Sequence, residues 1–146
     1  MKIYVASSWR NEYLHRGTVE VLRAAGHDVY DFRHPRPDDH GFSWGDIASQ
    51  WKGWTVQEYQ EALKHPIAEA GFKSDKDALD WAEVGVLVMP CGRSAHLELG
   101  YLAGQGKPCA ILACEPMEPE LMVKLCSGGV LGSFDELLVW IEAVPS

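Results

Sequence analysis

The fold of this chain is decided by Val84-Gly-Val-Leu-Val-Met89, which runs directly into Pro90-Cys-Gly-Arg-Ser-Ala-His-Leu-Glu98. The first part is a nearly unbroken apolar run, as expected of a central strand that is buried on both faces of a parallel sheet. The second part turns into a helix that we expect to begin near Ser94, which is well placed to cap it, and to end at the glycines of residues 104–106. A buried strand followed by a helix is the repeating unit of an α/β sheet protein.

The same alternation extends in both directions along the chain. Apolar runs predict strands at residues 2–6, 27–32, 84–89 and 108–113, with a weak last strand at 129–131. Helices are predicted at residues 11–25, 55–64, 74–83 and 118–125, and Ser133-Phe-Asp-Glu136 predicts the cap of a final one. Because the sequence has no internal repeat and no linker, we expect residues 1–146 to form one domain. We therefore expect a doubly wound, flavodoxin-like or Rossmann-like sheet of five parallel strands with helices on both faces.

Composition excludes several functional classes. The net charge is −8, and the 13 Lys and Arg residues are scattered, so we expect no nucleic acid polymer as a partner. The four cysteines form no C-x-x-C pair, and no apolar run has the length of a signal peptide core or a membrane span. Metal ligands could lie in the run from His34 to His40, but no third cluster completes a site. We expect a cytoplasmic protein with free thiols, no bound metal and no contact with membranes.

Ligands of doubly wound sheets bind beyond the carboxyl ends of the strands, close to the point where the strand order reverses. Three segments of this chain follow the first three strands. The first is Ser7-Ser-Trp-Arg10, the second is the long loop of residues 34–54 with its aromatic residues Phe42 and Trp44, and the third is residues 90–98. These segments hold the candidate site residues.

Glu98 is the candidate nucleophile. One turn into a helix, its carboxylate is favoured in the ionised form by the free amide groups and the helix dipole, and a carboxylate nucleophile must be ionised. The alternative is a surface carboxylate that only complements the dipole. His96 could act as a general acid, but two residues from Glu98 it points to another side of the helix. Gly92, Arg93 and Ser94 form a plausible anion pocket at the helix start, or else a solvated loop.

Three motifs resemble the nucleoside 2-deoxyribosyltransferases and their relatives that hydrolyse 2'-deoxynucleoside 5'-monophosphates. Lys2-Ile-Tyr-Val-Ala-Ser-Ser-Trp9 is similar to the family's first strand and loop, and Tyr4 matches its tyrosine near the nucleophile. Asp75-Lys-Asp-Ala-Leu-Asp-Trp-Ala-Glu83 resembles the segment with an aspartate of the substrate pocket, best matched by Asp75, with Asp77 or Asp80 as fallbacks. His96-Leu-Glu-Leu-Gly-Tyr-Leu-Ala-Gly-Gln-Gly-Lys-Pro108 resembles the segment that carries the nucleophile, which falls on Glu98.

The resemblance implies an enzyme that cleaves the N-glycosidic bond of a nucleoside or nucleoside 5'-monophosphate through a covalent glycosyl-glutamate, ending in hydrolysis or in transfer to another base. Tyr4 would orient Glu98, and Asp75 would hold or protonate the base. No cofactor is needed, and a homodimer or higher homo-oligomer is implied. Sugar or 5'-phosphate contacts are expected from Ser7, Ser8, Trp9, Arg10, Gly92, Arg93 and Ser94. Phe42 and Trp44 would stack on the base, cover the site or belong to the core.

Two alternatives remain open at this point. One is a module that binds a nucleotide or nucleotide-sugar without turning it over, and the other is a glycohydrolase that acts on NAD or a related ribosyl nucleotide. The family carries a base-contacting aspartate where this chain has Cys91-Gly-Arg-Ser94, and this departure favours a substrate that bears a phosphate.

Overall fold

Five parallel strands form one sheet in the computed structural model, which describes residues 1–145. The strand order is β2-β1-β3-β4-β5, so the order reverses between β1 and β3. The strands are β1 (Lys2–Ala6), β2 (Asp28–Asp31), β3 (Val84–Val88), β4 (Cys109–Leu112) and β5 (Gly129–Leu131). This arrangement confirms the predicted α/β fold, and the strand order is that of flavodoxin-like proteins.

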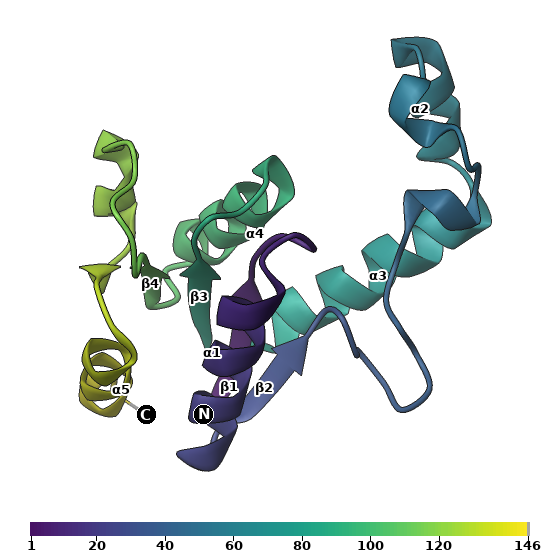
Figure 1. Cartoon of the computed structure of the whole chain (residues 1–146). Coiled ribbons are helices and arrows are strands. Elements are labelled where there is room, and N and C mark those ends of the chain that lie inside the picture. Colours follow the sequence, from purple (N-terminus) through teal and green to yellow (C-terminus); the bar gives the residue numbers. More distant parts are fainter. Residues whose placement is uncertain (146) are drawn as a thin grey trace. The chain divides into compact units, whose positions relative to one another are not determined.

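The sheet belongs to the first of two compact units, which comprises residues 1–31 and the chain from Trp81 onward. Its helices are α1 (Glu12–Ala24), α4 (Arg93–Gly104) and α5 (Phe134–Ala143), with a short 3-10 helix, η3 (Leu121–Leu125). The helices α1 and α5 pack on one face of the sheet and α4 packs on the other (Figure 1). None of the helices within residues 1–145 is both long and apolar enough to cross a membrane.

Successive side chains of each strand point alternately to these two faces of the sheet. The face under α1 and α5 carries the main hydrophobic core, in which Ile3 and Val5 of β1 meet Val84 and Val86 of β3 and Leu22 of α1. The face under α4 carries Tyr4 and Gly85, which are register partners in β1 and β3. A side chain at position 85 would collide with Leu102 of α4. Gly85 therefore lets α4 approach the sheet beside Tyr4.

The second unit comprises residues 32–80. Its elements are the 3-10 helices η1 (Trp44–Asp46) and η2 (Trp51–Gly53), the helix α2 (Val56–Ala62) and the helix α3 (Pro66–Trp81), which ends at the unit's boundary. The predicted capping box is confirmed at α2, where Thr55 accepts from the backbone N–H of Glu58 and Glu58 accepts from the backbone N–H of Thr55.

Three local predictions were wrong. The helix expected to start at Ser74 starts eight residues earlier, because Pro66 suits the first helical position as well as it ends the preceding helix. Residues 121–125 form a 3-10 helix and not the expected α-helix of residues 118–125. Ser94 does not cap α4, since the N-cap residue is Gly92 and no side chain caps it.

Candidate functional site

The candidate site begins where two neighbouring strands, β1 and β3, end. The hydroxyl of Ser7 donates a hydrogen bond of 2.9 Å to the carbonyl oxygen of Val88, and the amide nitrogen Nδ2 of Asn11 donates one of 3.1 Å to the carbonyl oxygen of Pro90. These bonds join the loop after β1 to the turn after β3. The strand order reverses at this edge, where doubly wound sheets bind their ligands.

The loop after β1 brings four predicted residues to this edge. Ser7 and Ser8 are half-buried, whereas Trp9 and Arg10 are exposed. The Oγ of Ser8 accepts from the backbone N–H of Arg10 at 3.2 Å, and the backbone N–H of Asn11 donates to the carbonyl oxygen of Ser8. The turn is thus fixed by its own serines. The hydroxyl of Ser7 already donates its hydrogen to Val88, so toward a ligand it acts as an acceptor, for example from a sugar hydroxyl.

The start of helix α4 determines how far Glu98 lies from the helix N-terminus. Because α4 starts at Arg93, Glu98 lies in its second turn, slightly further from the helix start than the one turn that we had expected. The helix dipole weakens beyond the first turn, so it favours the ionised carboxylate less than the sequence suggested. Gly92, Arg93 and Ser94 are exposed at the start of the helix, beside the loop that follows β1.

The sides of α4 separate Glu98 from His96. Ala95, Leu99 and Leu102 form the buried stripe of the helix, and the half-buried Glu98 flanks this stripe. His96 lies on the opposite flank, because consecutive helix residues are about 100° apart. This order confines Glu98 and His96 to different sides of the helix.

The His96 flank faces an apolar cavity of about 310 Å³. Ile111 of β4 lines this cavity, so that flank of α4 is directed toward β4. Its other lining residues are Met89, His96, Leu99, Gly100, Ala103, Met117, Glu120, Met122, Val123, Leu125 and Cys126. Since α4 packs on both β3 and β1, the flank that carries Glu98 is directed toward β1.

Tyr4 lies on the same side of the sheet as Glu98. It is buried in β1, only 1% exposed, and its register partner Gly85 contacts α4. The structure therefore places Tyr4 and Glu98 on the same side of the sheet, the side that α4 covers. Tyr101 follows Glu98 by three residues and shares its flank, a spacing that the sequence already contained.

Cys91 is a neighbour of Glu98 that the sequence did not single out. Its Sγ lies 3.5 Å from Nδ1 of His96 and 3.4 Å from Sδ of Met89. Burial, and next the negative charge of Glu98, raise the pKa of the Cys91 thiol to about 11. The thiol therefore stays neutral near pH 7, and it is a poor nucleophile.

Asp75 lies on the half-buried side of α3. Ala78 and Leu79, three and four residues later, are buried on the same side. The two fallback residues differ, because Asp77 pairs with Lys73 and Asp80 pairs with Lys76 on the exposed side. Asp75 thus differs from the two fallback residues in that it is half-buried beside the buried residues of α3.

Phe42 and Trp44 pack among aromatic side chains of the second unit. The ring of Trp44 makes edge-to-face contacts with Phe42 at 4.7 Å, Trp54 at 5.6 Å and Tyr59 at 5.8 Å between centroids. The side chain of Phe42 also fills the space beside Gly71 of α3. These contacts give the long loop an ordered cluster of its own, which favours a core role for these two rings.

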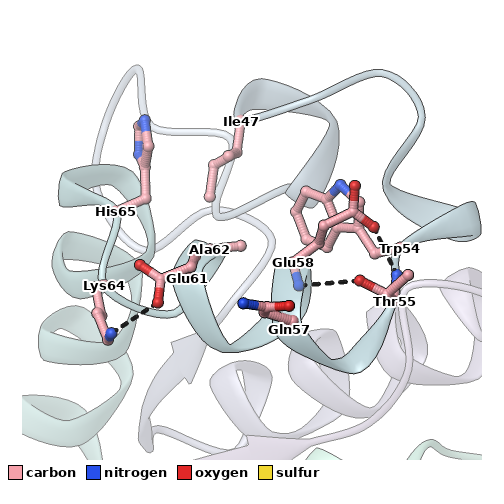
Figure 2. Close-up of a pocket in the computed structure, with 9 residues that line it drawn as sticks. All are labelled: Ile47, Trp54, Thr55, Gln57, Glu58, Glu61, Ala62, Lys64 and His65. Carbon is pink, nitrogen blue, oxygen red and sulfur yellow. Dashed lines mark hydrogen bonds and ion pairs between the residues drawn. The ribbon is translucent and has the colours of Figure 1, made fainter.

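A wide depression of about 600 Å³ lies over α2 in the second unit (Figure 2). Its polar groups already serve the chain itself, since Glu58 belongs to the capping box and Glu61 pairs with Lys64. Nδ1 of His65 accepts from the backbone N–H of Ile67. With its carboxylates so engaged, this depression is a poorer catalytic site than the Glu98 edge.

Metal ligands are not gathered in the described part of the chain. Within residues 1–145, no three His, Cys, Asp or Glu side chains lie together in a way that could hold a metal ion. The rings of His34 and His40 meet edge to face, 6.0 Å apart.

Comparisons with known proteins give a likeness in structure alone. No family model and no curated protein matches this chain. A 2-deoxyribosyltransferase from Bacillus psychrosaccharolyticus matches with a TM-score of 0.60 and 19% identity, over 94% of this chain and 90% of that one. The CMP N-glycosidase BcmB from Clostridium botulinum matches with a TM-score of 0.53 and 13% identity, over 97% of this chain and 99% of that one. Both likenesses bear out, at the level of the fold, the family resemblance that the sequence motifs indicated.

Proposed function

We propose that this protein is an enzyme that cleaves the N-glycosidic bond of a nucleoside or nucleoside 5'-monophosphate, with Glu98 as the nucleophile. The observation that carries the proposal is the position of Glu98, half-buried on the flank of α4 that is directed toward β1, on the same side of the sheet as Tyr4. The named activities of the two similar structures, deoxyribosyl transfer and CMP N-glycoside cleavage, support the same class of reaction.

In the first step, a carboxylate oxygen of Glu98 forms a bond to C1' of the sugar as the bond from C1' to the base nitrogen breaks. The electron pair of that bond stays on the base, which takes up a proton. The covalent glycosyl-glutamate is then opened at C1' by water, which gives the free sugar, or by another base, which gives a new nucleoside. Retaining glycosidases use a carboxylate in this way to stabilise an oxocarbenium-like transition state.

Each further residue has one proposed task. Tyr4 orients Glu98 through a hydrogen bond, and Asp75 holds the base or protonates it as it leaves. Arg93 and Ser94, exposed at the start of α4, bind the 5'-phosphate, with Ser7 and Ser8 nearby. A neutral Cys91 adds no second negative charge beside Glu98, so the edge stays open to an anionic substrate.

The test is a chromatographic assay for free base. The purified protein is incubated with nucleosides, nucleoside 5'-monophosphates and NAD, each with and without an acceptor base. We expect release from a (deoxy)nucleoside or its 5'-monophosphate, lost by at least a thousandfold in Glu98→Gln. Trapping by acid quench followed by intact mass spectrometry should detect the glycosyl adduct in the native protein only. Release that persists in Glu98→Gln would contradict the nucleophile, and ligand binding without any release would indicate a binding module.

A further inference from the structure

Four side-chain positions form a row across the sheet on the face under α4. Tyr30 of β2 pairs in register with Tyr4 of β1, Tyr4 pairs with Gly85 of β3, and Gly85 pairs with Cys109 of β4. Register partners in neighbouring strands point to the same face. The row therefore has two large rings at the end formed by β2 and β1. At the end formed by β3 and β4 it has a glycine without a side chain and a small cysteine.

This change in size determines where α4 can lie. Leu99 and Leu102 of α4 come close to the notch at Gly85, where a Cβ would lie 2.6 Å from Cδ1 of Leu102 and 3.1 Å from Sγ of Cys109. The two tyrosine rings stand beside the notch, on the side of β1 and β2. The Glu98 flank of α4 thus faces the ring end of the row.

The two rings are packed against each other and not merely adjacent. Their centroids are 5.3 Å apart and their planes differ by 19°, which is a stacked arrangement. Tyr4 is almost fully buried and Tyr30 is half-buried. A ring on a strand is free to rotate about χ2 unless a neighbour fixes its plane. In this row Tyr30 is the neighbour that stacks on Tyr4 and so restricts its ring plane from the side of β2.

We propose that Tyr30 is a positioning residue, whose stacked ring holds the phenol of Tyr4 in the orientation that it needs toward Glu98. The inference rests on the function proposed above and assigns a task to a residue outside the sequence motifs. Tyr30 acts through its ring face, so its own hydroxyl is not required. Loss of the ring should lower kcat about threefold to tenfold, the range that one aromatic contact supports, and leave KM nearly unchanged.

A double-mutant cycle tests this assignment, because it isolates the coupling of two residues in contact. The variants are Tyr30→Met, Tyr30→Leu, Tyr30→Phe, Tyr4→Phe and the combinations of Tyr4→Phe with the first two. Tyr30→Phe keeps the ring and should retain the native kcat. Tyr30→Met and Tyr30→Leu should each lower kcat in the native background, and neither should lower it further once the Tyr4 hydroxyl is absent. Tyr13→Leu, at an exposed position of α1, is the matched control and should leave kcat unchanged.

Other outcomes overturn the inference in ways that can be told apart. If Tyr30→Met or Tyr30→Leu lowers kcat equally with and without Tyr4→Phe, the ring supports the sheet and does not act through Tyr4. If Tyr30→Phe loses as much activity as Tyr30→Leu, the hydroxyl of Tyr30 acts and not its ring. If the native protein releases no base from any substrate, both the proposed function and the inference fail. If the native protein is active and Glu98→Gln is inactive, the proposed function holds whatever the Tyr30 variants show. Circular dichroism of each variant checks the fold. If only one of Tyr30→Met and Tyr30→Leu folds, its comparison with and without Tyr4→Phe decides the case, and a loss of kcat in Tyr30→Phe overturns the inference in any event.

Discussion

The chemistry of the candidate site depends on which of its groups carry charge. A second carboxylate beside Glu98 would repel an anionic substrate, but the side chain that lies there is the thiol of Cys91. Burial and the charge of Glu98 both raise its pKa, because both disfavour the thiolate. Cys91 therefore adds no negative charge at neutral pH, and this feature can be tested without any substrate.

We expect Cys91 to react slowly with iodoacetamide at pH 8, since its thiolate forms only as the pH approaches about 11. Glu98→Gln removes the negative charge of Glu98 and should speed the alkylation of Cys91, because a lower thiol pKa raises the fraction of reactive thiolate. The rate should stay below that of an exposed thiol, since burial is the larger cause of the raised pKa. Peptide mapping by mass spectrometry gives the rate at each cysteine. Cys114 is exposed and serves as the internal control. An unchanged rate at Cys91 would mean that the two side chains are not neighbours in solution.

The aspartates of α3 give a second prediction at the same scale. Asp75→Asn should lower kcat for base release by about a hundredfold or more, the usual contribution of a general acid. Asp77→Asn should leave kcat unchanged and cost about 0.5 kcal/mol at most, because it only removes an exposed ion pair with Lys73. The two variants are compared by steady-state kinetics and thermal unfolding. Equal losses of kcat in both would contradict the assignment of Asp75.

Single residues were predicted unevenly from the sequence. Tyr4 and Asp75 came from the family resemblance of short motifs, and Glu98 from that resemblance and from its place near the start of a predicted helix. Cys91 and Tyr30 carry no such signal, because their importance comes from neighbours in space, across the turn after β3 or across two paired strands. Register between strands far apart in the chain is not visible in one sequence. The position of Tyr101 could have been predicted, since a spacing of three residues from Glu98 places both side chains on the same flank of a helix.

At the scale of elements, the distance between α4 and the sheet determines how deeply Glu98 is buried. Gly85 permits the short distance, because it has no side chain that would meet α4. Gly85→Ala places a methyl group 2.6 Å from Cδ1 of the buried Leu102, and overpacking of this kind costs about 1–3 kcal/mol. We expect a lower free energy of unfolding, measured by urea denaturation. Base release should also slow, because the helix that carries Glu98 must shift.

Gly100→Ala is the matched control on the same helix. A Cβ at position 100 meets no atom within 4 Å, so the substitution should stabilise the protein by about 0.5–1 kcal/mol through helix propensity alone. Its kcat should equal that of the native protein. If Gly85→Ala also proves neutral in stability and in kcat, close approach of α4 is not what positions Glu98.

Strands were predicted well, because each is a short apolar run that ends at a polar or glycine-rich turn. Helix starts were predicted well at Thr55 and Ser133, where a side chain makes the cap, and also at α1, where Asn11 is the N-cap residue without a side-chain cap. The start of α4 was misplaced by one residue because a glycine occupies the N-cap position. Ser74 resembled a cap but lies inside α3, where its flanking charged residues form ion pairs along the helix.

At the scale of the whole molecule, the two units differ in how much apolar surface they bury. The sheet unit buries most of its strand residues completely, including Ile3, Val86 and Leu112. Among the described residues of the second unit, the buried apolar side chains are Ala62, Ala68, Ala78 and Leu79, and each keeps 6–8% of its surface exposed. Three of these four are alanines, so aromatic contacts around Trp44 must supply much of the second unit's order.

This difference predicts unequal stability within one chain. Amide hydrogen exchange followed by mass spectrometry should show the slowest exchange in β1, β3 and β4 and faster exchange across residues 32–65, where little apolar surface holds the backbone closed. Trp44→Leu removes three ring contacts, each worth about 0.5–1.5 kcal/mol, and should speed exchange within residues 32–80. Exchange in the central strands should stay as slow as in the native protein. Faster exchange of those strands in Trp44→Leu would mean that the units open together, and Trp44 would then stabilise the whole fold and not only its own cluster.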